Sequence, residues 1–253
     1  MKKKLKNIDK LFVPAITWLI LIIAWEIIVH LFKIEQYILP PPFIIIKTLV
    51  LSINILIPHI QFSLLTAISG LALAIVFSLF ISTLMDLFPL LRKALYPILV
   101  MSQTIPIIFI YPLLMIWFGF GIVPKIIIVI LVCFFPISVN LSDGLLNTDQ
   151  EYIDLFKSMN AGKWKTFILV KLPGSMPQFF SGLKIAGTYS VIGAVISEWL
   201  GAKKGLGIYM IRSYKSFSTS NVFAAIIVVV LLSFSIFLLI KLLEKILLTW
   251  SFK

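Results

Sequence analysis

The chain is a series of long apolar runs separated by short polar segments. The runs cover about 11–32, 62–85, 94–118, 122–142, 179–200 and 221–243. A helix needs about 20 mostly apolar residues to cross a hydrocarbon layer of roughly 30 Å. Strands of a membrane barrel would instead alternate apolar and polar residues over about ten positions. The pattern therefore predicts an all-α, polytopic membrane protein with about six transmembrane helices, formed by residues 1–253 as a single domain.

The start of the chain, MKKKLKNIDK before an apolar run, has the order of a signal peptide. The run is too long for one, and no small-residue cleavage site follows it, so we expect a retained first helix. The next segment, 33–59, contains Pro40-Pro41-Pro42 and is not expected to continue a helix. Its apolar part, 43–57, is expected to lie on the membrane surface or against the bundle.

Composition supports the membrane assignment. Hydrophobic residues make up 60% of the chain and charged residues 13%, with a mean hydropathy of +1.10. Soluble domains have about 45–50% apolar and about 25% charged residues, so a water-soluble fold is excluded. The net charge of +12 comes mainly from Lys at the ends of the runs, which is typical of a topology signal. We expect contact with the lipid bilayer and not with nucleic acid.

The distribution of Lys and Arg predicts the orientation. With both termini on one side, segments 1–10, 86–93, 143–178 and 244–253 share that side, and 15 of the 22 cations lie there or at adjacent helix ends. Cytoplasmic loops are enriched in Lys and Arg. We therefore expect a multi-pass protein of the cell membrane with both termini in the cytoplasm.

The connection 143–178 is much longer than the segment 86–93 on the same side, and long connections in a compact fold are usually functional. It predicts two short helices, 150–159 and 163–171, separated by Asn160-Ala161-Gly162 and stopped by Leu172-Pro173. Met159, Ala161, Trp164 and Phe167 would form an apolar cluster rimmed by Lys. Such a cluster fits a docking site, and it fits equally an amphipathic loop on the lipid surface.

The same connection resembles the cytoplasmic "EAA" loop of ATP-binding-cassette importer permeases. Asp154-Leu155-Phe156 stand at E-A-A, Asn160 at the glycine and Leu172-Pro173 at the Leu-Pro. Asn adopts positive φ more readily than other non-glycine residues, so Asn160 is expected to make the same turn. Leu155 and Phe156 are bulkier than Ala and predict a wider seat for the helix.

Five further segments are similar to the nitrate, sulfonate, taurine and thiamine-precursor branch of these permeases, in the same order. They are YILPPPFIIIKTL, SQTIPIIFIYPLLMIWFGFG, FFPISVNLSDGL, LPGSMPQFFSGLKIA and SEWLGAKKGLG. The resemblance implies six helices in a type I importer fold, a second permease copy, two cytoplasmic ATP-binding subunits and an external solute-binding protein. It also implies a set of ATPase-coupling residues: Asp154, Ser158, Met159, Asn160, Ala161, Gly162, Trp164, Leu172 and Pro173.

The chain lacks the chemistry of an enzyme. No segment matches the phosphate-cradling G-x-x-x-x-G-K-[ST] pattern, and no metal-binding or nucleophilic set is apparent. We expect no cofactor and no metal on this chain, with ATP and Mg held by the partner ATPase. Cys133, the only cysteine, is expected to be a buried small apolar residue.

Polar residues inside the apolar runs have two interpretations. Either they line a translocation path, or they form hydrogen bonds within and between helices. The second is the more common role for any single residue. The candidates are Ser102, Gln103, Thr104, Ser138, Asn140, Ser190 and Ser197.

Four charged or titratable residues lie near the ends of runs. Glu198 is expected to pair with Lys203 or Lys204, or to serve as an outer gate or binding-protein contact. Glu26 is expected to have a structural role. His30 and His59 are expected to be interfacial polar groups.

We carry three functions forward: an importer permease, a stand-alone secondary transporter and a membrane scaffold. A secondary transporter should have ion-coupling acids near the midplane, and the runs hold few besides Glu26 and Glu198. A scaffold has no need of the long connection.

For the permease we expect a small cargo such as a sulfonate, nitrate or a thiamine precursor. The absence of an internal duplication makes a homodimer the simpler expectation.

Overall fold

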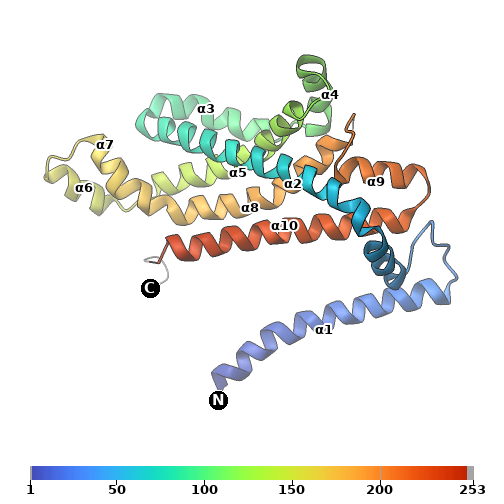
Figure 1. Ribbon diagram of the computed structural model, residues 1–253. Helices are drawn as coiled ribbons and strands as arrows, with labels where there is room; N and C mark the ends of the chain where they lie inside the picture. The colour runs from blue at the N-terminus through green and yellow to red at the C-terminus, as the bar shows by residue number, and fades with distance from the viewer. Residues whose placement is uncertain (1, 200, 250–253) are drawn as a thin grey trace. The chain divides into compact units, whose positions relative to one another are not determined.

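The computed structural model describes residues 2–199 and 201–249, and these residues form helices without strands. The elements, labelled in Figure 1, are α1 (Lys2–Leu31), α2 (Pro42–Leu87), α3 (Pro89–Ser102), α4 (Ile107–Phe118), α5 (Val123–Leu146), α6 (Gln150–Ser158), α7 (Lys163–Thr166), the π-helical turn η1 (Phe167–Lys171), α8 (Leu172–Glu198), α9 (Leu206–Lys215) and α10 (Thr219–Leu247). The all-α expectation is confirmed.

The chain divides into two compact units. The first combines Met1–Ile57 with Tyr209–Val228, and the second combines Pro58–Ile208 with Val229–Lys253. Within the first unit, the Trp25 and Phe223 rings lie 5.6 Å apart. Glu26 contacts His30 at 3.1 Å and accepts a hydrogen bond from the Phe43 amide. The structural role expected of Glu26 is therefore confirmed.

The second unit is built around α5 and α8, which lie side by side in Figure 1. Their backbones approach closely because small residues stand at the interface. A Cβ at Gly182 would overlap the carbonyl oxygen of Pro136, and one at Gly144 would crowd Ser175. Cys133 is buried here, and its thiol donates to the Ala186 carbonyl at 3.3 Å.

The end of α10 also packs on α8 within this unit. Gly187 leaves room for the Ile240 side chain, which a Cβ at that position would overlap. Lys184 forms an ion pair with Glu244 at 3.0 Å, and both side chains are mostly buried. A close glycine contact and a shielded ion pair thus hold α10 against α8.

The segment 43–57 is not a separate surface element, contrary to our expectation. It forms the first part of α2, a continuous helix of 46 residues that the sequence predicted only over 62–85. Pro42 stands at the start of the helix, where its missing N–H removes no hydrogen bond. In an apolar environment backbone groups need partners within the chain, so the helix continues through Pro58.

The predicted span 94–118 is broken. Helices α3 and α4 meet at a bend of 102° across residues 103–106. Pro106 has no N–H and disfavours the helical conformation at Ile105, which explains the break. Five helices in the described residues are long and apolar enough to cross a membrane, or six if the bent pair counts as one span.

The connection 201–220, between the fifth and sixth apolar runs, contains the helix α9. Its apolar residues fall between basic ones and are too few to resemble a span. No long hydrophobic run therefore marks this helix in the sequence.

The close packing of α5 on α8 predicts a strong effect of a side chain at position 182. We expect Gly182→Val to lower the thermal unfolding temperature in detergent by several degrees, because overpacking costs about 1–3 kcal/mol. The control is Gly162→Ala, where a Cβ meets nothing within 4 Å. Equal unfolding temperatures for the two variants would contradict the described contact.

Candidate functional site

The long connection folds as a helical hairpin, residues 150–171, whose first arm is α6. Asp149 caps this helix by accepting a hydrogen bond from the Glu151 amide at 3.0 Å. On its exposed face, Asp154 accepts hydrogen bonds from Lys157 at 2.8 Å and Gln150 at 2.9 Å. These two bonds, that from Lys157 first, lower the pKa of Asp154. The carboxylate is therefore held in its charged form on the hairpin surface.

Asn160 makes the turn at the hairpin tip. Its φ is 56°, the left-handed conformation that usually calls for glycine. The Asn160 amide donates to Lys157 O and the Ala161 amide to Phe156 O, both at 2.9 Å. This pair of bonds is the Schellman arrangement, with Asn160 at the position after the helix cap. The expectation that Asn160 makes a turn at positive φ is confirmed.

The second arm continues directly into α8. The prediction that Leu172-Pro173 stops a helix is therefore wrong. Residues 163–198 form consecutive helical elements through η1, in which the Leu172 amide donates to Phe167 O. The wider π turn accommodates Pro173, which has no N–H to donate. Leu172-Pro173 therefore begins α8, and the arm is a rigid extension of a membrane helix.

Most of the predicted coupling residues gather on the outer surface of the hairpin. The Trp164 ring stacks on Phe167 at 5.6 Å between ring centres, yet Trp164 remains 57% exposed and Met159 70% exposed. Exposed residues at the tip and on α6 include Asp154, Ser158, Asn160 and Gly162, while Ala161, Leu172 and Pro173 are half-buried. The structure brings these side chains together as a polar and apolar surface, and their role stays a prediction.

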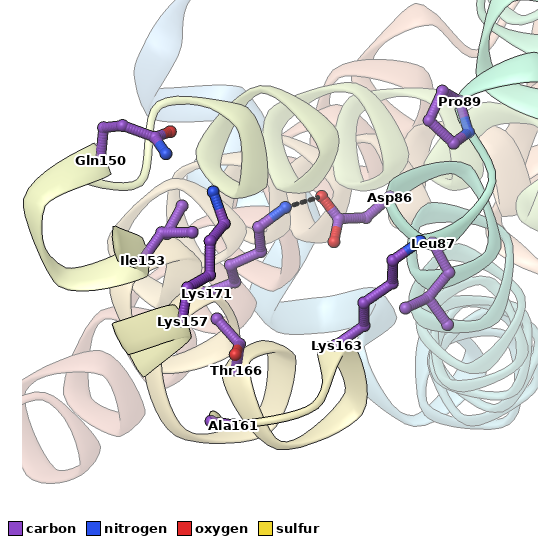
Figure 2. A pocket seen from close by; sticks show the side chains of 10 residues that line it. All are labelled: Asp86, Leu87, Pro89, Gln150, Ile153, Lys157, Ala161, Lys163, Thr166 and Lys171. Atoms are coloured by element: carbon purple, nitrogen blue, oxygen red, sulfur yellow. Dashed lines mark hydrogen bonds and ion pairs between the residues drawn. The ribbon is translucent and has the colours of Figure 1, made fainter. Parts of the chain in front are cut away.

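An ion pair joins the base of the hairpin to α2. The Lys171 ammonium lies 2.7 Å from the Asp86 carboxylate, and the two side chains are 24% and 6% exposed. Asp86 stands in the last turn of α2, where a negative charge is unfavourable next to the helix dipole. Lys171 offsets this cost. Figure 2 shows the pair at one side of a pocket between the hairpin and the α2–α3 junction.

A second polar contact joins the middle of α2 to the C-terminal end of α8. The Ser63 hydroxyl donates to both carboxylate oxygens of Glu198, at 2.8 and 2.9 Å, and Glu198 also accepts from the Gly207 amide at 2.9 Å. Glu198 is fully buried. The predicted ion pair with Lys203 or Lys204 is wrong, since both lysines are exposed and the carboxylate is satisfied by neutral donors.

The start of α9 explains this arrangement. Three consecutive amides find side-chain acceptors: Gly205 on His59, Leu206 on Ser63 and Gly207 on Glu198. Such amides have no partner within their own helix. Gly205 has φ 126°, and a Cβ there would overlap the Glu198 carboxyl group. Within the segment SEWLGAKKGLG, Glu198 and residues 205–207 are thus joined to one another and to α2 by hydrogen bonds.

The two polar contacts define a length along α2 and α8. At 1.5 Å per residue, Ser63 and Asp86 lie about 35 Å apart along α2, and Glu198 and Lys171 about 40 Å apart along α8. A bilayer with its headgroups measures about 40–45 Å. The separation of the two contacts is thus close to the thickness of a bilayer with its headgroups.

The polar residues proposed for a path divide into two groups. Buried Ser190 and Ser197 donate to carbonyls of their own helix at 2.8 and 2.6 Å, and the Asn140 amide donates to Pro136 O at 2.7 Å. These bonds favour the helix-stabilising interpretation. Ser102, Gln103 and Thr104 lie at the exposed break between α3 and α4, where the Ser102 and Thr104 hydroxyls also donate to backbone carbonyls, at 2.7 and 2.8 Å.

Sequence reasoning missed a set of serines on α2. The Ser78 and Ser82 hydroxyls donate to the carbonyls of Phe134 and Ser138 on α5, each at 3.1 Å. The Ser138 hydroxyl itself has no hydrogen-bond partner among the described residues. A spacing of four residues between serines in an apolar run marks one face of a helix, and that signal could have identified the contact.

The chain belongs to the family described as binding-protein-dependent transport system inner membrane component, whose model matches residues 70–248. It is a membrane permease component, and the resemblance to importer permeases is confirmed. Scaffold and stand-alone transporter are thereby disfavoured.

Three relatives match along nearly the whole chain. The formylaminopyrimidine transport permease protein ThiX of Halalkalibacterium halodurans is 40% identical over 95% of this chain and 96% of its own length. A probable ABC transporter permease protein of Haemophilus influenzae is 35% identical over 90% and 93%. The putative aliphatic sulfonates transport permease protein SsuC of Bacillus subtilis is 32% identical over 95% and 86%.

The Asp86–Lys171 pair predicts a recognisable pattern of stabilities. Asp86→Asn or Lys171→Gln should each destabilise the protein by about 2 kcal/mol, because each leaves a shielded charge without its partner. The exchange Asp86→Lys with Lys171→Asp should recover part of that loss. The measurement is thermal unfolding of the four proteins in one detergent. If the destabilisation of the exchanged variant equals the sum of the destabilisations of the two single variants, the two residues do not interact.

Proposed function

We propose that the 150–171 hairpin docks this permease onto a separate ATP-binding subunit, which hydrolyses ATP for import. The supporting observation is the exposed pair Met159 and Trp164 beside the tight Asn160 turn. Exposed apolar groups with a polar rim are typical of a docking surface. Neither ATP nor Mg would bind to this chain, because it carries no phosphate-binding loop.

The hairpin is well placed to convey movement. Its second arm is continuous with α8, and the Asp86–Lys171 pair joins its base to α2. A displacement at Trp164 would therefore move two membrane helices together. The Ser63–Glu198 contact would pass that movement to the segment before α9 at the far boundary. Rigid-body movement of packed helices is a common form of such transitions.

The complete transporter would contain two copies of this chain, two ATP-binding subunits and an external solute-binding protein. A homodimer is the simpler arrangement, because the chain has no internal duplication.

Both termini and the hairpin would face the cytoplasm, which the concentration of Lys in that set of segments supports. Glu198 would then lie near the outer face, where a gate or a binding-protein contact would form. Ser102, Gln103 and Thr104 would be the best-placed path residues.

We propose that the cargo is a formylaminopyrimidine, a small thiamine precursor. The relative that is 40% identical is named after this compound. Relatives named for sulfonates and taurine match with 32% and 28% identity. The higher identity to the formylaminopyrimidine permease, over 95% of this chain, supports the pyrimidine as the cargo. Selection would rest largely with the solute-binding protein.

Docking by the hairpin predicts loss of the ATPase from a charged variant. Trp164→Asp and, independently, Met159→Asp should each reduce the amount of co-purified ATP-binding subunit at least tenfold, because each places a carboxylate in an apolar contact. The bulky Asn160→Trp should act similarly, because it strains the turn. The matched control is Trp164→Phe, which should retain the subunit. If the subunit stays bound in the charged variants, the docking assignment is wrong.

The cargo assignment predicts a ligand preference of the partner. The solute-binding protein that associates with this permease should bind N-formylaminopyrimidine at least a hundredfold more tightly than taurine or nitrate, as measured by titration calorimetry. A preference for taurine or another sulfonate would replace the proposed cargo and leave the docking proposal unaffected.

A further inference from the structure

The pocket beneath the hairpin has the charge of an anion site. It measures about 350 Å³, within the range of about 300–1,000 Å³ found for small-molecule sites. Lys157, Lys163 and Lys171 contribute three ammonium groups to its lining, and Asp86 contributes one carboxylate. The lining therefore carries a net charge of +2. Figure 2 shows the lysines entering it from α6, α7 and η1.

The three lysines differ in whether a carboxylate already binds their ammonium groups. Lys171 is paired with the shielded Asp86, and its ammonium has two further N–H groups beside the one in that bond. Lys157 pairs with Asp154 at a site where both side chains are about 60% exposed, and such surface pairs hold each other weakly. Lys163 has no carboxylate within ion-pair distance among the residues the structure describes. In Figure 2 it extends toward Leu87 at the end of α2. The pocket thus offers donors that are free to meet an anion.

The depth of the pocket identifies the layer that it faces. Asp86 and Lys171 lie about 35–40 Å from the Ser63–Glu198 contact along their helices. The hydrocarbon core occupies about 30 Å, and the headgroup regions extend the bilayer to about 40–45 Å. This separation matches a site at the level of phospholipid headgroups.

We propose that this pocket binds the phosphate group of an anionic phospholipid from the adjacent leaflet. Lys163 is the principal contact, and Lys157 and Lys171 assist it. The apolar part of the lining, Leu87, Pro89 and Ile153, contacts the glycerol and the first acyl carbons. An anionic lipid fits better than a zwitterionic one, because the net positive lining repels a choline or ethanolamine group. The pocket shares Ala161 with the proposed docking surface, but lipid binding to the permease alone is measured without the ATPase, so the two proposals can fail separately.

The test uses the full chain purified in a neutral detergent, with binding measured by native mass spectrometry. The ligands are a short-chain phosphatidylglycerol, the matching phosphatidylcholine, glycerol phosphate and inorganic phosphate. Phosphatidylglycerol should bind at least tenfold more tightly than the other three. Lys163→Gln should weaken it about fivefold, the loss expected for one lysine near an anionic headgroup.

The matched control is Lys165→Gln, which removes the same charge two residues away. Lys165 is exposed and lies outside the pocket lining, so phosphatidylglycerol binding should be unchanged. Equal losses in the two variants would show attraction to surface charge in general and would overturn the proposal. So would equal binding of the two lipids. Glycerol phosphate or inorganic phosphate binding as tightly as phosphatidylglycerol would assign the pocket to a free phosphate compound instead.

Discussion

Polar groups inside a bilayer need partners within the protein, and the second unit meets this need by joining α2 to α8 at two places. Ser63 and Glu198 make one contact, and Asp86 and Lys171 make the other. Between them, Ser78 and Ser82 bind carbonyls of α5. With no water in the hydrocarbon layer, each of these bonds is costly to break. These contacts join α2 to α5 and α8 at several points along their length.

Under the proposed docking, these contacts would carry a displacement of the hairpin toward the Ser63–Glu198 contact. The second arm of the hairpin is continuous with α8, so it cannot move without the helix. At that contact, Glu198 holds the amide of Gly207 at the start of α9. Under the proposed docking, the carboxylate that satisfies this buried helix end would also receive movement from the hairpin.

Much of this organisation could be predicted from the sequence, where the determining interaction is local. The long apolar runs specified the membrane helices, and the identity of Asn160 specified the turn at positive φ. The predictions were wrong where the effect of a residue depended on its surroundings in the fold. Proline positions predicted breaks at 42 and 173, but Pro42 starts a helix and η1 accommodates Pro173. The break at Pro106, inside the predicted span 94–118, was not predicted. The partner of Glu198 was also missed, because Ser63 is distant in the sequence while Lys203 and Lys204 are close.

The central claim is that this chain moves its cargo only when a separate ATPase drives it. The most direct measurement is uptake of radiolabelled N-formylaminopyrimidine into proteoliposomes containing the chain, its ATP-binding subunit and its solute-binding protein. The account predicts uptake that requires all three components and ATP. Uptake by the chain alone, driven by an ion gradient without ATP, would contradict it.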